Sequence, residues 1–253
     1  MSTIRLHVTE PLAEGATLTL PAQQAHYLGS VMRRAVGDAV LLFNGRDGEW
    51  RASITTLGKG RATVLAQARL RAQTPPADLW LLAPVLKRET LEWMVEKATE
   101  LGVSRILPVT SERSAVHRTN VARLAGIAAE AAEQCRRLEV PDVAEPAPLA
   151  HLLARWEPPR LVLLADESGA SPPLASVLAD APRGPWAVLV GPEGGFAPAE
   201  LDGFRKLPFC RPAGLGPRIL RAETAALSAL AVLQAVAGDW QPLAAGWRDP
   251  HLT

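Results

Sequence analysis

The sequence predicts an α/β fold in which a small β-rich domain precedes a parallel sheet with helices between its strands. Three observations support this. Short runs of alternating polar and apolar residues, interrupted by Gly and Asp, fill residues 1–72. Consecutive prolines then end the pattern, and from residue 79 onward short apolar runs alternate with segments of helical spacing. Strands separated by helices imply parallel pairing, and ligands in such sheets bind at the carboxyl ends of the strands.

Residues 1–72 are expected to form a small barrel with one helix at residues 23–34. Residues 44–48 have the composition of a hairpin turn, since Asn and Gly tolerate positive φ. The strands are expected at residues 16–20, 39–43, 49–54 and 62–68.

The charge is unevenly distributed along the chain. Residues 1–72 carry a formal charge of +4 and the remaining residues carry −3. A basic domain favours a polyanionic partner, because neutralising phosphates releases counterions. A solvated basic face explains so small an excess equally well, so the charge alone leaves both interpretations open.

Residues 73–77 form the expected domain boundary, because Pro75 and Pro76 cannot continue a strand ladder. The predicted domains are therefore residues 1–72 and 77–253. In the second domain, apolar runs predict strands at residues 79–85, 106–109, 161–165 and 186–190. Helices are expected at about residues 91–101, from a cap at Thr119 or Asn120 to about Leu138, and at about residues 222–237.

The helix predicted at residues 222–237 is apolar on nearly every side. Such a helix is expected to be buried all round, either inside the domain or at a subunit interface. Its small residues, and its position directly after a candidate ligand site, favour the interface.

Composition excludes several classes of protein. No run approaches the roughly 20 apolar residues that a membrane helix needs, and the N-terminus has no basic region followed by an apolar one, so a cytoplasmic location is expected. Cys135 and Cys210 are far apart, and the five histidines are scattered. We therefore expect no disulfide framework and no metal site.

Two glycine-bearing loops are the strongest indication of a ligand site. Residues 191–196 (GPEGGF) follow an apolar strand, and residues 215–225 (LGPRILRAETA) lead into the last helix. Neither loop has the spacing of a phosphate-binding motif. The carboxylate of Glu193 would repel phosphate, whereas it suits a ligand with a cation, N–H donors or hydroxyl groups. S-adenosylmethionine has all three.

With these loops, several further segments resemble the signatures of the RsmE-type family of ribosomal RNA methyltransferases. They are residues 26–38, 97–103 (KATELGV), 111–114 (SERS) and 130–137 (EAAEQCRR). The segments occur in the family's order and extend over nearly the whole chain, which makes the resemblance specific.

The resemblance implies a PUA-like N-terminal barrel and a SPOUT-type parallel sheet with a C-terminal trefoil knot. It also implies a homodimer that uses S-adenosyl-L-methionine to methylate N3 of one uridine in 16S ribosomal RNA. The partner would be 16S ribosomal RNA or the assembled small ribosomal subunit, and no membrane is involved. A noncatalytic RNA-binding, ribosome-associated factor is the main alternative, and a nucleotide-binding enzyme acting on a small molecule is the other.

The candidate catalytic residues are Arg221 and Glu223. Uridine N3 must lose its proton before or while it attacks the methyl group. Arg221 can donate hydrogen bonds to a carbonyl that gathers negative charge, and Glu223 can accept the proton or orient Arg221. From spacing alone, a structural ion pair or a capping carboxylate is the simpler explanation, and the resemblance favours catalysis.

For the cofactor, the candidates combine glycine backbone, apolar surface and one carboxylate that suits the ribose hydroxyls or the amino end. For glycines in general, a tight turn is the commoner role. The candidates are Leu164, Gly191, Glu193, Gly195, Leu215, Gly216, Ile219 and Leu220.

For RNA, arginines placed after strands or at a helix end are candidate phosphate ligands, although each one taken alone is more often solvated surface. An extruded base and a basic track are expected, as opposed to a linear motif. The candidates are Arg5, Arg33, Arg34, Arg113, Arg136 and Arg137.

Overall fold

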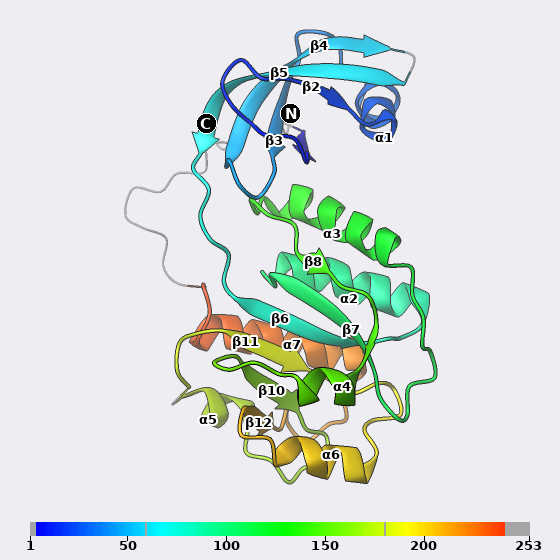
Figure 1. Cartoon of the computed structure of the whole chain (residues 1–253), viewed down its shortest axis with the longest axis vertical. Helices are drawn as coiled ribbons and strands as arrows, with labels where there is room; N and C mark the ends of the chain where they lie inside the picture. The colour runs from blue at the N-terminus through cyan, green and yellow to red at the C-terminus, as the bar shows by residue number, and fades with distance from the viewer. Residues whose placement is uncertain (1–3, 59, 180, 241–253) are drawn as a thin grey trace. The chain divides into compact units, whose positions relative to one another are not determined.

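The computed structural model describes residues 4–58, 60–179 and 181–240, which fall into two compact units (Figure 1). The first unit holds the described residues up to Pro75 together with Ala132–Val140. The second holds Pro76–Ala131 and the described residues from Pro141 onward. Residues 1–3 and 241–253 of the two predicted domains lie outside the described residues.

The first unit is a five-stranded sheet with the strand order β1-β3-β4-β5-β2. β1 runs parallel to β3, and the other pairs are antiparallel. The four predicted strands are present, and β1 is additional because three residues are too short to give a sequence pattern. The strands are β1 (Arg5–His7), β2 (Thr17–Leu20), β3 (Ala39–Phe43), β4 (Glu49–Gly58) and β5 (Arg61–Arg71).

The predicted helix at residues 23–34 is shorter than expected. α1 covers Ala22–His26 and continues as one π-helical turn over Tyr27–Val31. The helix cannot extend to Arg34, because Arg33 has a φ of 51° in the left-handed region.

All five strands of the first unit contribute apolar side chains to one core, and Leu28 of the π-helical turn packs into it. Residues two apart on a strand point to the same face, so alternate residues such as Leu18 and Leu20 are buried. The described residues include no pairing between β1 and β2, so closure into a barrel stays a prediction.

A buried ion pair joins Arg5 of β1 to Glu49 of β4, and Arg5 also binds the end of α3 (Val121–Cys135) within the first unit. The Nε of Arg5 donates to Glu49 at 2.7 Å, and both side chains are at most 4% exposed. The remaining nitrogens of Arg5 donate to the carbonyl oxygens of Ala132, Glu133 and Arg137 at 2.8–2.9 Å. Arg5 thus satisfies carbonyls that the end of a helix leaves without partners.

The second unit contains a seven-stranded sheet with the order β12-β10-β11-β6-β7-β8 and with β9 also paired to β7. All of its strand pairs are parallel, as predicted. The four predicted strands correspond to β6, β7, β10 and β11. The other three escaped prediction because they are two residues long or, in β12, contain Arg211 and Pro212. The strands are β6 (Leu79–Pro84), β7 (Arg105–Thr110), β8 (Asp142–Val143), β9 (Ala147–Pro148), β10 (Leu161–Ala165), β11 (Trp186–Leu189) and β12 (Cys210–Ala213).

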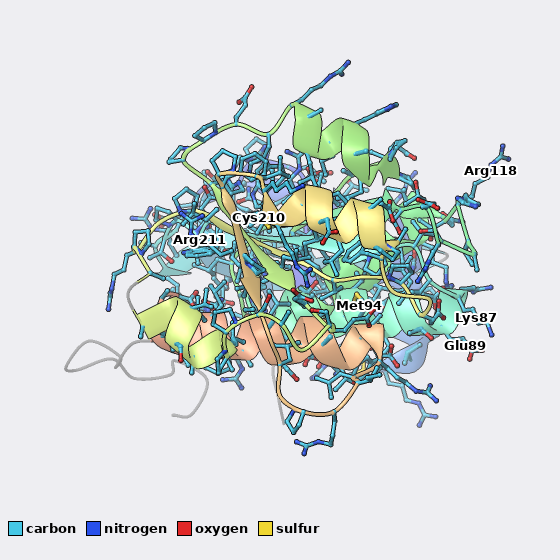
Figure 2. The ribbon with its side chains drawn as sticks, turned by 90° about the horizontal axis from the view of Figure 1, so that it is seen from below. Lys87, Glu89, Met94, Arg118, Cys210 and Arg211 are labelled. Carbon is cyan, nitrogen blue, oxygen red and sulfur yellow. The ribbon has the colours of Figure 1, made fainter. Side chains whose placement is uncertain are left out.

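Helices cover both faces of this sheet. α4 (Leu149–Ala154) and α6 (Pro198–Arg205) pack with β10 and β11 in one core, and Figure 2 shows them on one side of the sheet with α5 (Leu174–Ala179) and α7 (Ala222–Val236) on the other. α7 also packs against α2 (Arg88–Glu100), whose Met94 is fully buried. α3 begins at the predicted cap, because Asn120 Oδ1 accepts the N–H of Arg123.

α7 is buried on one side only, which corrects the expectation of burial all round. Ala226, Ala229, Leu230 and Leu233 are buried, whereas Val236 is 42% exposed. α7 is therefore not an interior helix of the single chain. Its burial in a subunit interface stays a prediction. Among the described helices, none has the length and hydropathy that crossing a bilayer requires.

We expect Arg5→Met to lower the free energy of unfolding by about 3–5 kcal/mol, because it leaves the carboxylate of Glu49 buried without its 2.7 Å partner. Equilibrium urea denaturation measures this, with Arg51→Met on the exposed surface of β4 as the control. If both variants lose less than about 0.5 kcal/mol, the pair contributes no more than a surface arginine does.

Candidate functional site

A cleft of about 690 Å³ lies at the carboxyl ends of three adjacent strands, β12, β10 and β11. Parallel pairing brings the loops that follow these strands to the same edge of the sheet. The cleft is lined by Thr90, by Ala165–Gly169, Ser171 and Pro173 after β10, by Val190–Glu193 and Phe196 after β11, and by Gly214–Glu223 and Ala225 after β12.

A tight turn at Gly195 shapes the loop after β11. The N–H of Gly195 donates to the carbonyl of Pro192 at 2.9 Å, and Gly195 has a φ of 64°, which glycine adopts without strain. A Cβ at this position would lie 1.9 Å from Oε1 of Glu167. Gly195 therefore makes a tight turn and leaves room for the neighbouring loop, and it is not itself a lining residue.

The loop after β12 is attached to the loop after β10. The N–H of Gly214 donates to the carbonyl of Pro172 at 2.8 Å, and the N–H of Leu174 donates to the carbonyl of Gly214 at 3.0 Å. The chain then turns through Gly216, whose φ is 105°, and reaches Ile219, which is 85% exposed although it lines the cleft. An apolar side chain this exposed is suited to covering a ligand.

Arg221 and Glu223 both line the cleft at the start of α7. Arg221 is the residue before the helix and its side chain makes no capping hydrogen bond, while Glu223 lies in the first helical turn, where the helix dipole favours a carboxylate. In the described part of the chain neither side chain has a hydrogen bond or an ion pair, so the structural ion pair considered above does not form. Both groups are free to contact a substrate.

The loop after β10 is organised by Asp166, whose side chain is fully buried. Burial opposes ionisation of this carboxyl, but hydrogen bonds from the Ser171 hydroxyl, the Ser168 N–H and Arg205 outweigh burial and lower the pKa to about 2. The carboxylate therefore stays charged at neutral pH.

Six of the eight predicted cofactor residues line the cleft, namely Gly191, Glu193, Leu215, Gly216, Ile219 and Leu220. Gly195 lies behind the wall. The prediction that Leu164 contacts the cofactor is wrong, because its side chain is fully buried in the core with Leu82 and Leu189. Strand alternation points Leu164 into the core, and the wall of the cleft begins at Ala165.

Sequence reasoning missed Thr90, Glu167, Ser168 and Ser171. The polar run directly after the strand at residues 161–165 was the available signal, because it begins where a parallel strand ends.

The predicted RNA-binding arginines have different surroundings. Arg113 is exposed and its Nη1 donates to the carbonyl of Gly194 at 3.3 Å, beside the cleft loop. Arg33 is exposed in the first unit, and Arg34 is partly exposed at 4.0 Å from Asp38.

The other three contribute to the structure of the first unit. Arg5 is buried against Glu49, so its prediction as an RNA ligand is corrected: its nitrogens are engaged by a carboxylate and three carbonyls. Arg137 is 10% exposed and paired with Glu139 at 2.9 Å. Arg136 is partly exposed, and its carbonyl accepts from Arg71.

The charges of the cleft favour a cationic ligand. Three carboxylates (Glu167, Glu193, Glu223) and two guanidinium groups (Arg218, Arg221) line it, together with the apolar Val190, Phe196, Ile219 and Leu220. The remaining lining carboxylate, Asp166, is paired with Arg205. Among the described residues no lysine lines the cleft, which disfavours a polyphosphate. Its volume lies in the usual range for a small-molecule site, so these residues fit S-adenosylmethionine. Among the residues described, no group of three His, Cys, Asp or Glu could hold a metal ion.

Comparisons with known proteins identify the family of this chain. A family model described as an RNA methyltransferase domain matches residues 73–234, and one described as an RNA methyltransferase PUA domain matches residues 20–67. Ribosomal RNA small subunit methyltransferase E of Rickettsia conorii is 29% identical over 95% of this chain and 98% of its own. The protein of the same name from Synechocystis sp. is 34% identical over 87% of this chain and 74% of its own.

Solved structures are similar along nearly the whole chain. Ribosomal RNA small subunit methyltransferase E from Neisseria gonorrhoeae, bound to S-adenosyl methionine, has a TM-score of 0.85 at 29% identity, covering 94% of this chain and 100% of its own. A protein of Legionella pneumophila, solved in complex with the bound cofactor SAM, has a TM-score of 0.82 at 30% identity, covering 93% of this chain and 98% of its own. The chain therefore belongs to the ribosomal RNA small subunit methyltransferase E family, the RsmE-type RNA methyltransferases.

Proposed function

We propose that this chain is an S-adenosyl-L-methionine-dependent methyltransferase that forms 3-methyluridine at one uridine of 16S ribosomal RNA. The observation that carries the proposal is the cleft at the ends of β10, β11 and β12, where Arg221 and Glu223 face the same space as the two glycine loops. The relatives and solved neighbours that match along the whole chain support the same activity.

When bound, the cofactor supplies an electrophilic methyl group on a positively charged sulfur. The chain's own residues must then stabilise the uracil as its N3 proton leaves. Arg221 donates hydrogen bonds to the uracil carbonyl that gathers negative charge, and Glu223 accepts the proton or orients Arg221. A site with few competing waters makes both interactions stronger.

The cofactor is held by the loops after β11 and β12. Backbone groups of Gly191, Leu215, Gly216 and Leu220 bind the adenosine, and Ile219 provides apolar surface for the adenine. Glu193 binds the ribose hydroxyls or the amino end. The Gly195 turn keeps this loop open beside Glu167.

The RNA is bound by exposed and partly exposed arginines on each unit. Arg113 beside the cleft loop contacts phosphate near the target nucleotide, and Arg33, Arg34 and Arg136 of the first unit contact phosphates elsewhere. Residues 1–72 act as a PUA-like RNA-binding barrel and residues 77–253 as the SPOUT methyltransferase domain. The target uridine is extruded into the cleft, because N3 of a paired base is inaccessible.

Three finer features belong to the same proposal. A C-terminal trefoil knot is supported by the bonds between Gly214 and the loop at Pro172–Leu174, since they fasten the chain after β12 to the loop after β10. A homodimer is supported by the partly exposed apolar face of α7. A 16S ribosomal RNA or small-subunit substrate implies that the chain works in the cytoplasm.

Methyl transfer from labelled S-adenosylmethionine to unmodified small ribosomal subunits tests the function, with the product nucleoside identified by mass spectrometry. We expect labelled 3-methyluridine. Label on another base would overturn the target, and cofactor binding without any transfer to subunits or free 16S RNA would favour a noncatalytic RNA-binding factor.

We expect Arg221→Ala to lower kcat by about 10²–10³-fold, the usual cost of removing a donor to developing negative charge, while the Kd for S-adenosylmethionine stays within about threefold. Single-turnover methylation and calorimetry measure the two quantities. Arg183→Ala, which removes an exposed arginine outside the cleft, serves as the control. Equal losses of turnover and cofactor affinity would instead make Arg221 a part of the binding wall.

We expect Glu193→Gln to raise the Kd for S-adenosylmethionine about tenfold, because it removes a charge from the ligand-facing wall, with kcat at saturating cofactor little changed. Calorimetry at low and high salt measures the effect, which should shrink as salt screens the charge. An unchanged Kd at low salt would place Glu193 outside the cofactor contacts.

A further inference from the structure

A buried ion pair lies behind one wall of the cleft. Asp166 directly follows β10, and its side chain is fully buried, whereas Arg205 is the last residue of α6 and its side chain is 26% exposed. Nη2 and Nε of Arg205 donate to the same oxygen, Oδ2 of Asp166, at 2.6 and 2.9 Å. Arg205 does not line the cleft.

The pair folds the loop that follows β10. Oδ1 of Asp166 accepts the N–H of Ser168 at 2.9 Å, and Oδ2 accepts the hydroxyl of Ser171 at 2.5 Å. Nη2 of Arg205 also donates to the hydroxyl oxygen of Ser168 at 2.5 Å. One carboxylate and one guanidinium therefore fix a loop that has no regular secondary structure of its own.

This loop touches both of the other walls. Glu167 lines the cleft, and its Oε1 occupies the space beside Gly195 that a side chain there would fill. The carbonyl of Pro172, one residue after Ser171, accepts the N–H of Gly214, which begins the loop after β12. A displacement of residues 166–171 would therefore disturb the loops after β11 and β12 together.

We propose that Arg205 is a positioning residue for cofactor binding, acting through Asp166 to hold residues 166–171 in the conformation that completes the cleft. The proposal rests on the proposed function, because S-adenosylmethionine is the ligand whose affinity it concerns. α6 lies on the same face of the sheet as α4 and contributes no residue to the lining of the cleft. The proposal nevertheless gives α6 a role in the site, through Arg205.

Electrostatics gives the reason why the position needs an arginine. A buried carboxylate is costly unless it is paired and hydrogen-bonded. Without Arg205, the described partners of Asp166 would be two serine donors, the N–H of Ser168 and the hydroxyl of Ser171. The loop would then rearrange to bring the carboxylate toward water. Lysine can keep the charge but cannot reproduce both the bidentate contact and the bond to Ser168.

Calorimetry with S-adenosylmethionine and steady-state methylation test the proposal on the full-length protein. We expect Arg205→Gln to raise the Kd and the KM for the cofactor at least tenfold. The kcat at saturating cofactor and the KM for RNA should stay within about threefold of the unmutated protein. Arg205→Lys should recover part of the cofactor affinity. Hydrogen exchange in the free protein should increase at residues 166–171 in Arg205→Gln.

Two matched controls remove other charges in this region. Asp202→Asn deletes the second, exposed partner of Arg205, which lies 3.2 Å from Nη1, and leaves Asp166 untouched. Arg211→Ala removes an exposed arginine on β12 beside Cys210 (Figure 2). Both should change the cofactor Kd less than twofold.

Three outcomes would overturn the proposal. An unchanged cofactor Kd in Arg205→Gln, with a lower melting temperature, would make the pair a purely structural contact of α6. Equal losses of kcat and of both affinities would indicate general disruption. Unchanged exchange at residues 166–171 would show that the loop does not depend on Arg205. Failure of the unmutated protein to bind S-adenosylmethionine is a separate result, which would refute the proposed function itself.

Discussion

The cleft depends on one constraint, the parallel pairing of β10 with both β11 and β12. The register sets Leu164 opposite Leu189 on one side and Ala165 opposite Ala213 on the other, so the three strands end at the same level. Each strand then releases its loop at one edge of the sheet. Residues of these three loops, up to 60 positions apart in the chain, line the same space for this reason, and no loop has to form the site alone.

In each unit, an arginine that is paired with a buried carboxylate also hydrogen-bonds another segment of the chain. In the first unit, Arg5 pairs with Glu49 and binds carbonyls at the end of α3. In the second, Arg205 pairs with Asp166 and binds the loop beside the cleft. A buried pair repays its desolvation only when further hydrogen bonds satisfy the remaining donors and acceptors, and both pairs meet this condition. The two arginines thus hold these segments in place, and neither can bind phosphate with all of its donors.

Much of this arrangement could be predicted from the sequence because its signals are local. Apolar runs that end at glycine or a polar residue identified β6, β10 and β11, and the glycine loops gave most of the cleft. Strand β12 carries no apolar run, so its position beside β10 could not be inferred. The buried state of Arg5 depends on carbonyls more than 120 residues away, and no sequence window contains that contact. Alternation alone does not reveal which of Leu164 and Ala165 faces the cleft.

The proposed function requires that the cleft at the ends of β10, β11 and β12 binds the methyl donor. A crystal structure of this chain grown with S-adenosylmethionine tests it most directly. We expect density for the ligand between the loops at residues 190–196 and 214–225, in contact with Glu193 and Leu220 and with its methyl group facing Arg221. Density for the ligand at any other place in the chain, with this cleft empty at saturating concentration, would contradict it.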